Sequence, residues 1–140
     1  MKKFFVKEFC EIISEPRMFN CGSGLVVQHA ELPEVDDELS VSLRIKLKSH
    51  HTGWGTVFRK GGDESQGNFE RTPGLFLDAN ISKLYPRFTG HWSDNNGYLY
   101  KLQLHIGWYI DGEIGNFRYF NWRLSAEEAM KNYLNQRPFC

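Results

Sequence analysis

The chain has 140 residues, of which 41% are hydrophobic and 15% aromatic, enough for one domain with a core. Seventeen basic side chains balance seventeen acidic ones, which excludes the strong positive surface of a nucleic-acid or anionic-membrane binder. No stretch approaches the roughly 18 consecutive apolar residues of a membrane span. We therefore expect a single domain over residues 1–140 that binds neither nucleic acid nor membrane.

The amino terminus and the cysteines bear on the compartment. Lys7 and Glu8 interrupt the apolar start of the chain before it reaches the roughly 7–15 residues of a signal-peptide core, so we interpret it as mature chain. Cys10, Cys21 and Cys140 are odd in number and lack metal-ligand spacing, which favours free thiols and a cytoplasmic location. A disulfide between Cys10 and Cys21 stays open and would place the protein outside the cell.

The first half of the chain has the pattern of strands. A glycine turn at residues 22–24 leads into an apolar segment, residues 25–27. Residues 39–47 then alternate with a period of two, which predicts a strand with one wet face. Leu39, Val41, Leu43, Ile45 and Leu47 share one face, and Ser40, Ser42, Arg44, Lys46 and Lys48 share the other. A strand at residues 54–60 ends at two glycines, and a polar loop over 63–72 follows.

The middle of the chain predicts a hairpin and a further strand. Residues 73–77 and 83–88 form the two arms, with the turn at residues 78–80, because Asp and Asn tolerate turn conformations. Pro86 places the second arm at a sheet edge, since proline cannot donate to a neighbouring strand. Residues 98–106 alternate again. Tyr98, Tyr100, Leu102, Leu104 and Ile106 share one face of that strand.

The end of the chain predicts a helix. Ser125 and Glu128 have the spacing of a capping box, and the helix should stop before Pro138. Its apolar stripe consists of Ala126, Ala129, Met130, Tyr133 and Leu134. Short strands at close spacing followed by one helix indicate an all-β fold. We expect an antiparallel β-sandwich over residues 21–124 and a C-terminal helix over residues 125–137.

The order of these segments, over residues 21–134, resembles laminin-G-like or concanavalin-A-like jelly rolls. The matching pieces are the strands at 39–47 and 55–62, the Pro-Gly-Leu-Phe-Leu-Asp strand at 73–78, His105-Ile106-Gly107, and residues 112–120 and 124–128. The resemblance implies a recognition module whose ligand site lies in variable loops and rims, rather than an enzyme.

One departure from that family pattern concerns a Trp-containing strand and a Tyr-x-Asp-Gly hairpin. There is no room for them between Asn96 and Leu104. We therefore expect a jelly roll shortened by a central hairpin, with a free strand edge near residues 83–88 or 98–106. Such an edge favours self-association or pairing with a strand of a partner protein.

Catalytic chemistry is not indicated. The acidic run at residues 34–38 follows Pro33 and offers no pair of acids spaced along a strand, as a retaining glycosidase would need. His50 and His51 are adjacent and would point to opposite faces of a strand, which makes a poor metal site. We expect no enzyme activity, no catalytic residues and no bound metal.

Binding residues are expected in two polar turns, residues 78–80 and residues 93–97. Carboxylate and amide oxygens gather there, and calcium takes six to eight oxygen ligands, although turns favour these residues for backbone reasons alone. Trp92 lies between His91 and a polar run, which makes it the best contact residue among the tryptophans. The candidates are Asp78, Asn80, Trp92, Asp94, Asn95 and Asn96. We expect a protein-interaction domain without a cofactor; the alternative is an extracellular lectin-like glycan binder that depends on calcium.

Overall fold

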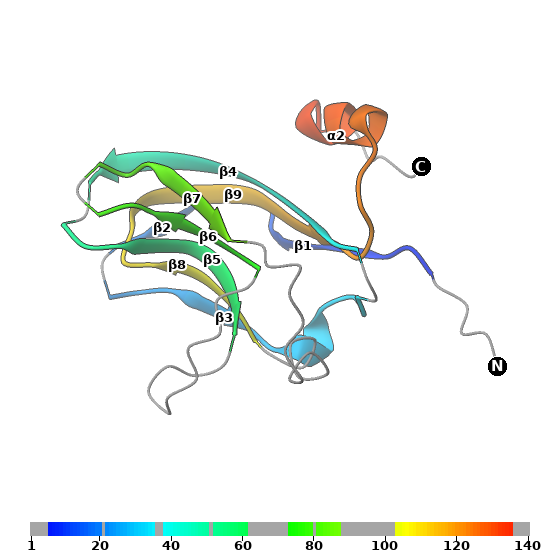
Figure 1. The fold of residues 1–140 in the computed structure, drawn as a ribbon, viewed down its shortest axis with the longest axis horizontal. Coiled ribbons are helices and arrows are strands. Elements are labelled where there is room, and N and C mark those ends of the chain that lie inside the picture. The colour runs from blue at the N-terminus through cyan, green and yellow to red at the C-terminus, as the bar shows by residue number, and fades with distance from the viewer. Residues whose placement is uncertain are drawn as a thin grey trace.

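A computed structural model describes residues 6–20, 22–35, 38–50, 52–61, 73–79, 81–87 and 103–135. The strands in these ranges form two antiparallel sheets, and a short helix follows the last strand (Figure 1). The elements are β1 (Phe9–Ile13), β2 (Arg17–Phe19), β3 (Leu25–Val27), the 3-10 turn η1 (His29–Glu31), β4 (Ser40–Ser49), β5 (Gly55–Gly61), β6 (Gly74–Leu77), β7 (Leu84–Arg87), β8 (Gln103–Trp108), β9 (Asp111–Phe120) and α2 (Ala126–Tyr133). The expected all-β class with antiparallel sheets and a C-terminal helix is confirmed.

The first sheet is built around β9. Along one side β9 pairs with β4 from Phe120 to Asp111. Along the other side it pairs with β1 and then with β2, which lie end to end. Both of these strands precede residue 21, where the sandwich was expected to begin. The second sheet has the order β3-β8-β5-β6-β7.

The core lies between the two sheets. Ile114, Phe117 and Tyr119 face it from β9, and Leu104 and Ile106 face it from β8. A large apolar side chain contributes roughly 1.5–3 kcal/mol when it is fully buried. The rings of Phe58 and Phe117 meet edge to face at 5.7 Å and so join the two sheets. The predicted inward direction of Leu104 is confirmed, and Leu102 lies outside the described residues.

The alternation predicted for β4 holds in its second half. Leu43, Ile45 and Leu47 pack against the core, whereas Arg44, Lys46 and Lys48 are exposed. In the first half, Ser40 and Ser42 are half-buried instead of facing water. The Ser40 hydroxyl donates to the Trp122 carbonyl at 2.8 Å, and Ser42 Oγ accepts from Asn132 Nδ2 at 2.8 Å. The segment that leads into and forms α2 therefore covers this part of the wet face.

The predicted hairpin at residues 73–88 is present as β6 and β7. The Asp78 amide donates to the Lys83 carbonyl at 2.8 Å and closes the turn. Among the described strands, β7 pairs with β6 alone, as the expected edge at Leu84–Arg87 requires. The other expected edge is wrong for Gln103–Ile106, because β3 and β5 flank β8 on its two sides. Residues 98–102 of that expected strand lie outside the described residues.

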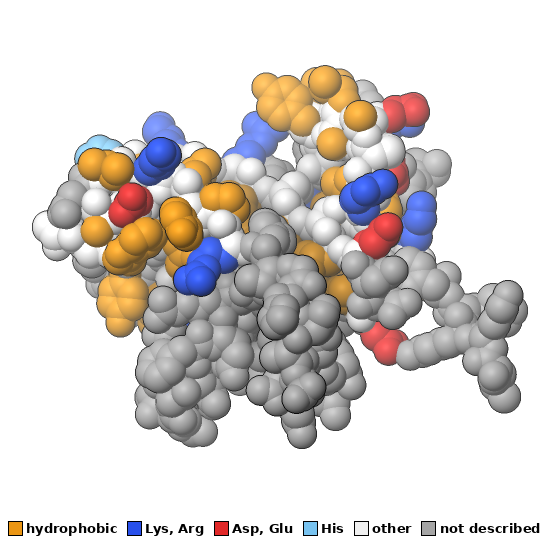
Figure 2. Space-filling model, in the orientation of Figure 1, with side chains coloured by type: hydrophobic (Ala, Val, Ile, Leu, Met, Phe, Trp, Pro, Cys, Tyr) orange, Lys and Arg blue, Asp and Glu red, His pale blue; other side chains and the backbone are white. Residues whose placement is uncertain are grey.

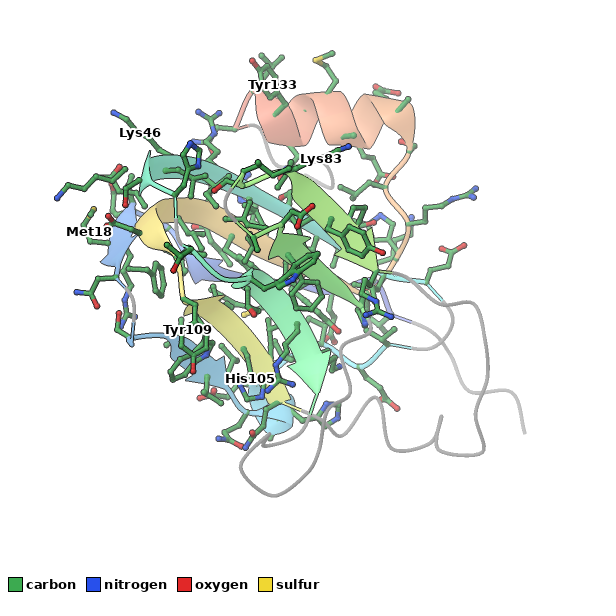
Figure 3. The ribbon with its side chains drawn as sticks, turned by 60° about the vertical axis from the view of Figure 1, so that its left-hand side comes forward. Met18, Lys46, Lys83, His105, Tyr109 and Tyr133 are labelled. Carbon is green, nitrogen blue, oxygen red and sulfur yellow. The ribbon has the colours of Figure 1, made fainter. Side chains whose placement is uncertain are left out.

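Helix α2 begins at the predicted capping box. The Ser125 hydroxyl accepts from the Glu128 amide at 3.1 Å, and a Glu128 carboxylate oxygen accepts from the Ser125 amide at 2.9 Å. The helix ends at Tyr133, earlier than the expected residue 137. Its contacts with the first sheet are polar, so its apolar stripe faces solvent, as Figure 3 shows for Tyr133.

Strand β8 requires a glycine near its end. Gly107 has a φ of +80°, and a Cβ atom at this position would lie 2.3 Å from the ring of Phe19, which is itself buried. An L side chain would therefore meet both backbone strain and a clash with the core.

We predict that Gly107→Ala lowers the free energy of unfolding by about 2–4 kcal/mol, as the sum of left-handed strain and overpacking. Gly22 supplies the control, because its φ is +99° but nothing lies within 4 Å of a built Cβ. Gly22→Ala should cost about 1–2 kcal/mol. Urea denaturation of both variants measures the difference. Equal losses would show that the contact with Phe19 does not matter.

Candidate functional site

Of the residues predicted to bind a ligand, the structure places Asp78. It follows β6 directly and is half-buried. The other predicted residues are Asn80, Trp92, Asp94, Asn95 and Asn96, and all five lie outside the described residues. The predicted grouping of the two turns is therefore untested, and the site is built here from what surrounds Asp78.

Asp78 lines a shallow depression at the end of the two sheets. The ends of β4 and β6, the loop before β5 and the turn between β8 and β9 meet there, at the left of Figure 1. The lining consists of Leu47, Ser49, Gly53, Gly55, Leu77, Asp78, Ser82, Tyr109, Ile110 and Asp111. Apolar residues from the core form part of the lining, and polar side chains from the loops complete it.

Two hydrogen-bonded pairs lie around this depression. The Ser49 hydroxyl donates to Asp111 Oδ2 at 2.5 Å, which joins β4 to the start of β9. His50 Nδ1 and Ser82 Oγ lie 2.7 Å apart, which joins the end of β4 to the turn before β7. Hydroxyl, imidazole and carboxylate groups at this spacing suit a polar ligand such as a sugar hydroxyl.

The His50–Ser82 pair has the distance of a nucleophile and its base. A working pair also needs a group that orients the imidazole and donors for an oxyanion. Neither is found around His50 in the described residues, and His50 is exposed. The pair therefore serves as a hydrogen bond that fixes the turn, and the geometry gives no reason to assign hydrolysis.

Beside the depression, two exposed aromatic side chains form what we call the β7 patch. They are Trp54 and Tyr85, whose exposed fractions are 51% and 49%. Ile81 and Leu84 are also exposed, at 60% and 53%, and Leu84 points to the face of β7 opposite to Tyr85. The rings of Trp54 and Tyr85 touch edge to face, with their centroids 5.5 Å apart. Figure 2 shows hydrophobic side chains gathered over the face that carries β6 and β7. Exposed aromatic side chains in contact with each other are a candidate contact surface.

The β7 patch was not among the sites expected from the sequence. Trp92 was expected to be the contact tryptophan, whereas Trp54 precedes β5 and is 51% exposed. The exposure of Tyr85 could have been predicted from the sequence. Pro86 marks β7 as an edge strand, and aromatic residues on an edge have only one neighbouring strand to cover them.

Lys60 is a second residue that the sequence analysis missed. It lies in the core with 3% of its surface exposed, which is unusual for a lysine. The register of β5 shifts between Thr56 and Phe58, so both Val57 and Phe58 face the core, and Lys60 does too. The Lys60 ammonium donates to the Tyr119 hydroxyl at 3.1 Å and lies 5.4 Å from the centre of its ring.

Burial sets the ionisation of this pair. It lowers the pKa of Lys60 from 10.5 to about 8 and raises the pKa of Tyr119, because each charged form would lose its hydration. The pair is enclosed between the sheets, so it offers no surface to a ligand. We assign it a structural role.

His105 and Cys10 are two further side chains that could take part in a reactive or metal-binding site. His105, labelled in Figure 3, is buried on β8 with Nε2 3.0 Å from the Gly61 carbonyl oxygen, which ties its ring to β5. Cys10 is a free thiol, and burial followed by Glu31 and Glu11 raises its pKa, which disfavours the reactive thiolate. Over the described ranges, no three His, Cys, Asp or Glu side chains gather closely enough to hold a metal ion.

Comparisons of this chain with family models, with curated proteins and with solved structures find no match. In the described part of the chain, no helix has the length and apolar content needed to cross a bilayer. The functional assignment therefore depends on the depression and on the β7 patch.

We predict that the free energy of unfolding rises by about 2 kcal/mol between pH 7 and pH 9.5 because of Lys60. The sign follows from its lowered pKa: above about pH 8 the folded protein releases this proton while the unfolded chain, with a pKa near 10.5, still holds it. Above pH 10 the raised pKa of Tyr119 acts in the opposite direction. Urea denaturation across this pH range measures the rise.

Lys60→Met is the control for this prediction. It removes the titrating group and keeps a side chain of similar length, so the rise with pH should vanish. A wild-type curve that is flat from pH 7 to pH 9.5 would contradict the assignment of Lys60 as a buried amine.

Proposed function

We propose that this chain is a non-catalytic recognition module, of shortened laminin-G-like jelly-roll type, that binds a protein segment on the β7 patch. The observation that carries the proposal is the contact between Trp54 and Tyr85, two half-exposed rings that lie together beside an edge strand. Tryptophan and tyrosine are the residues that most often dominate the binding energy of protein interfaces.

Exposed aliphatic side chains next to the patch favour a protein segment over a glycan. Ile81 precedes β7, Leu84 opens it on the face opposite to Tyr85, and both present apolar surface without a side-chain hydrogen-bonding group. A protein segment can cover such surface with apolar side chains of its own, whereas a sugar buries its hydroxyls only against polar partners. The alternative function, a lectin-like glycan binder, is favoured by the depression, where the Ser49–Asp111 and His50–Ser82 pairs lie near Tyr109.

The same surface favours a different partner over a second copy of this chain. Pro86 has no N–H to offer to a neighbouring strand, and Lys83 and Arg87 stand on either side of it. The missing N–H removes one backbone hydrogen bond for any added strand, whereas the two cations repel only a partner that is also basic, as a second copy of this strand would be. We therefore propose a heterologous protein partner ahead of edge-strand self-association.

The compartment belongs to the same proposal. The free thiol of Cys10 supports a reducing, cytoplasmic environment, which suits an interaction domain that uses no cofactor. The extracellular, calcium-dependent lectin remains the alternative, with Asp78 as the one described residue of its expected ligand set.

A display library of random peptides and a glycan array, both probed with the pure protein, test the proposed function. We expect selected peptides to bind, and Trp54→Ser combined with Tyr85→Ser to weaken them at least about tenfold, because interface aromatics contribute 1 kcal/mol or more. Tyr133→Ser on α2 is the matched control, since it removes an aromatic side chain that is 69% exposed elsewhere.

Glycan binding that survives loss of Trp54 and Tyr85 would favour the lectin alternative. Peptide binding that is equally insensitive to both aromatic residues would place the contact surface elsewhere on the molecule.

A further inference from the structure

Two cationic side chains stand on either side of Tyr85. Side chains two residues apart on a strand point to the same face, so Lys83 and Arg87 share the face of Tyr85. Both are exposed, and Figure 3 shows Lys83 at the start of β7. Neither side chain takes part in a hydrogen bond or an ion pair in the described part of the chain. The aromatic centre of the β7 patch is thus flanked by two unneutralised cations.

Within the described part of the hairpin, residues 73–79 and 81–87, the acidic residue is Asp78. Asp78 faces Lys83 across the hairpin turn, where its amide donates to the Lys83 carbonyl. Its half-buried carboxylate makes no ion pair with Lys83. Two cations against one carboxylate make the described part of the hairpin positive, although the chain as a whole has no net charge.

We propose that the β7 patch binds an acidic protein segment, with an apolar or aromatic anchor on Trp54 and Tyr85 and a carboxylate on either side. This proposal depends on the proposed function and specifies its partner. An extended segment alongside β7 places alternate side chains opposite Lys83, Tyr85 and Arg87, at about 4.5–5.5 Å between paired Cβ atoms. The partner therefore carries acidic residues two positions before and two positions after its anchor.

Other ligands fit the side chains of Lys83, Tyr85 and Arg87 less well. A second copy pairing antiparallel through β7 would place Lys83 opposite Arg87, and like charges in facing positions destabilise a strand pair. A basic segment would meet the same repulsion. Single-stranded nucleic acid also binds to cations and stacks on aromatic rings. Binding of a labelled oligonucleotide distinguishes it from a protein segment.

Fluorescence anisotropy with short labelled peptides tests this inference. One peptide contains Glu-Ser-Trp-Ser-Glu between Gly-Ser flanks, a second replaces both Glu residues by Lys, and a third replaces them by Gln. We expect the wild-type protein to bind the Glu peptide at least tenfold more tightly than the Lys peptide. The difference should shrink at high salt, because exposed charges are screened.

Charge reversal identifies the cations. Lys83→Glu combined with Arg87→Glu should invert the order, so that the Lys peptide binds more tightly than the Glu peptide. Lys46→Glu combined with Lys48→Glu makes the same change of charge on the exposed face of β4 and should leave the order intact. Circular dichroism of both double variants checks that they fold.

The outcomes separate this inference from the proposed function. If all three peptides bind equally and lose binding with Trp54→Ser, the patch binds protein segments without charge selection and the acidic partner is wrong. If none binds and display selection also fails, both proposals fail. Tighter binding of a labelled single-stranded oligonucleotide than of the Glu peptide would replace the protein partner by nucleic acid.

Discussion

Strand β9 is the element on which the rest of the structure depends. It pairs with β4 on one side and with β1 and β2 on the other, and its inward side chains Ile114, Phe117 and Tyr119 are all but completely buried. Its outward Arg118 donates to Glu11 at 2.7 Å and to Asn132 Oδ1 at 2.8 Å, which holds α2 over the sheet. The first sheet, the core and the helix therefore meet on one strand.

Local sequence patterns were enough to predict the elements whose signals lie within a few consecutive residues. The alternation of residues 39–47, the Asp turn before Lys83 and the capping box at Ser125 each indicated the element that the structure contains. Strands β1 and β2 were missed because they are short and owe their strand form to pairing with β9, about 100 residues later in the chain. Pairing over that separation leaves no periodic signal in the short segments themselves.

The site was less predictable than the fold. Asp78 was expected from turn chemistry, and it does line the depression. The exposure of Trp54 and the burial of Lys60 could not be predicted, because both depend on where β5 begins and on its register shift between Thr56 and Phe58. A shift of one residue moves each following side chain to the other face, and it carried Lys60 into the core beside Tyr119.

The β7 patch lies apart from the residues on which the core depends. Strand β7 pairs with β6 alone among the described strands, and its residues are exposed, so changes there disturb little that the core needs. The effects of mutations on the free energy of unfolding add best when the mutated residues share no partners. A surface at the end of a sheet can therefore change its aromatic and charged side chains while β9, β8 and β5 keep the fold.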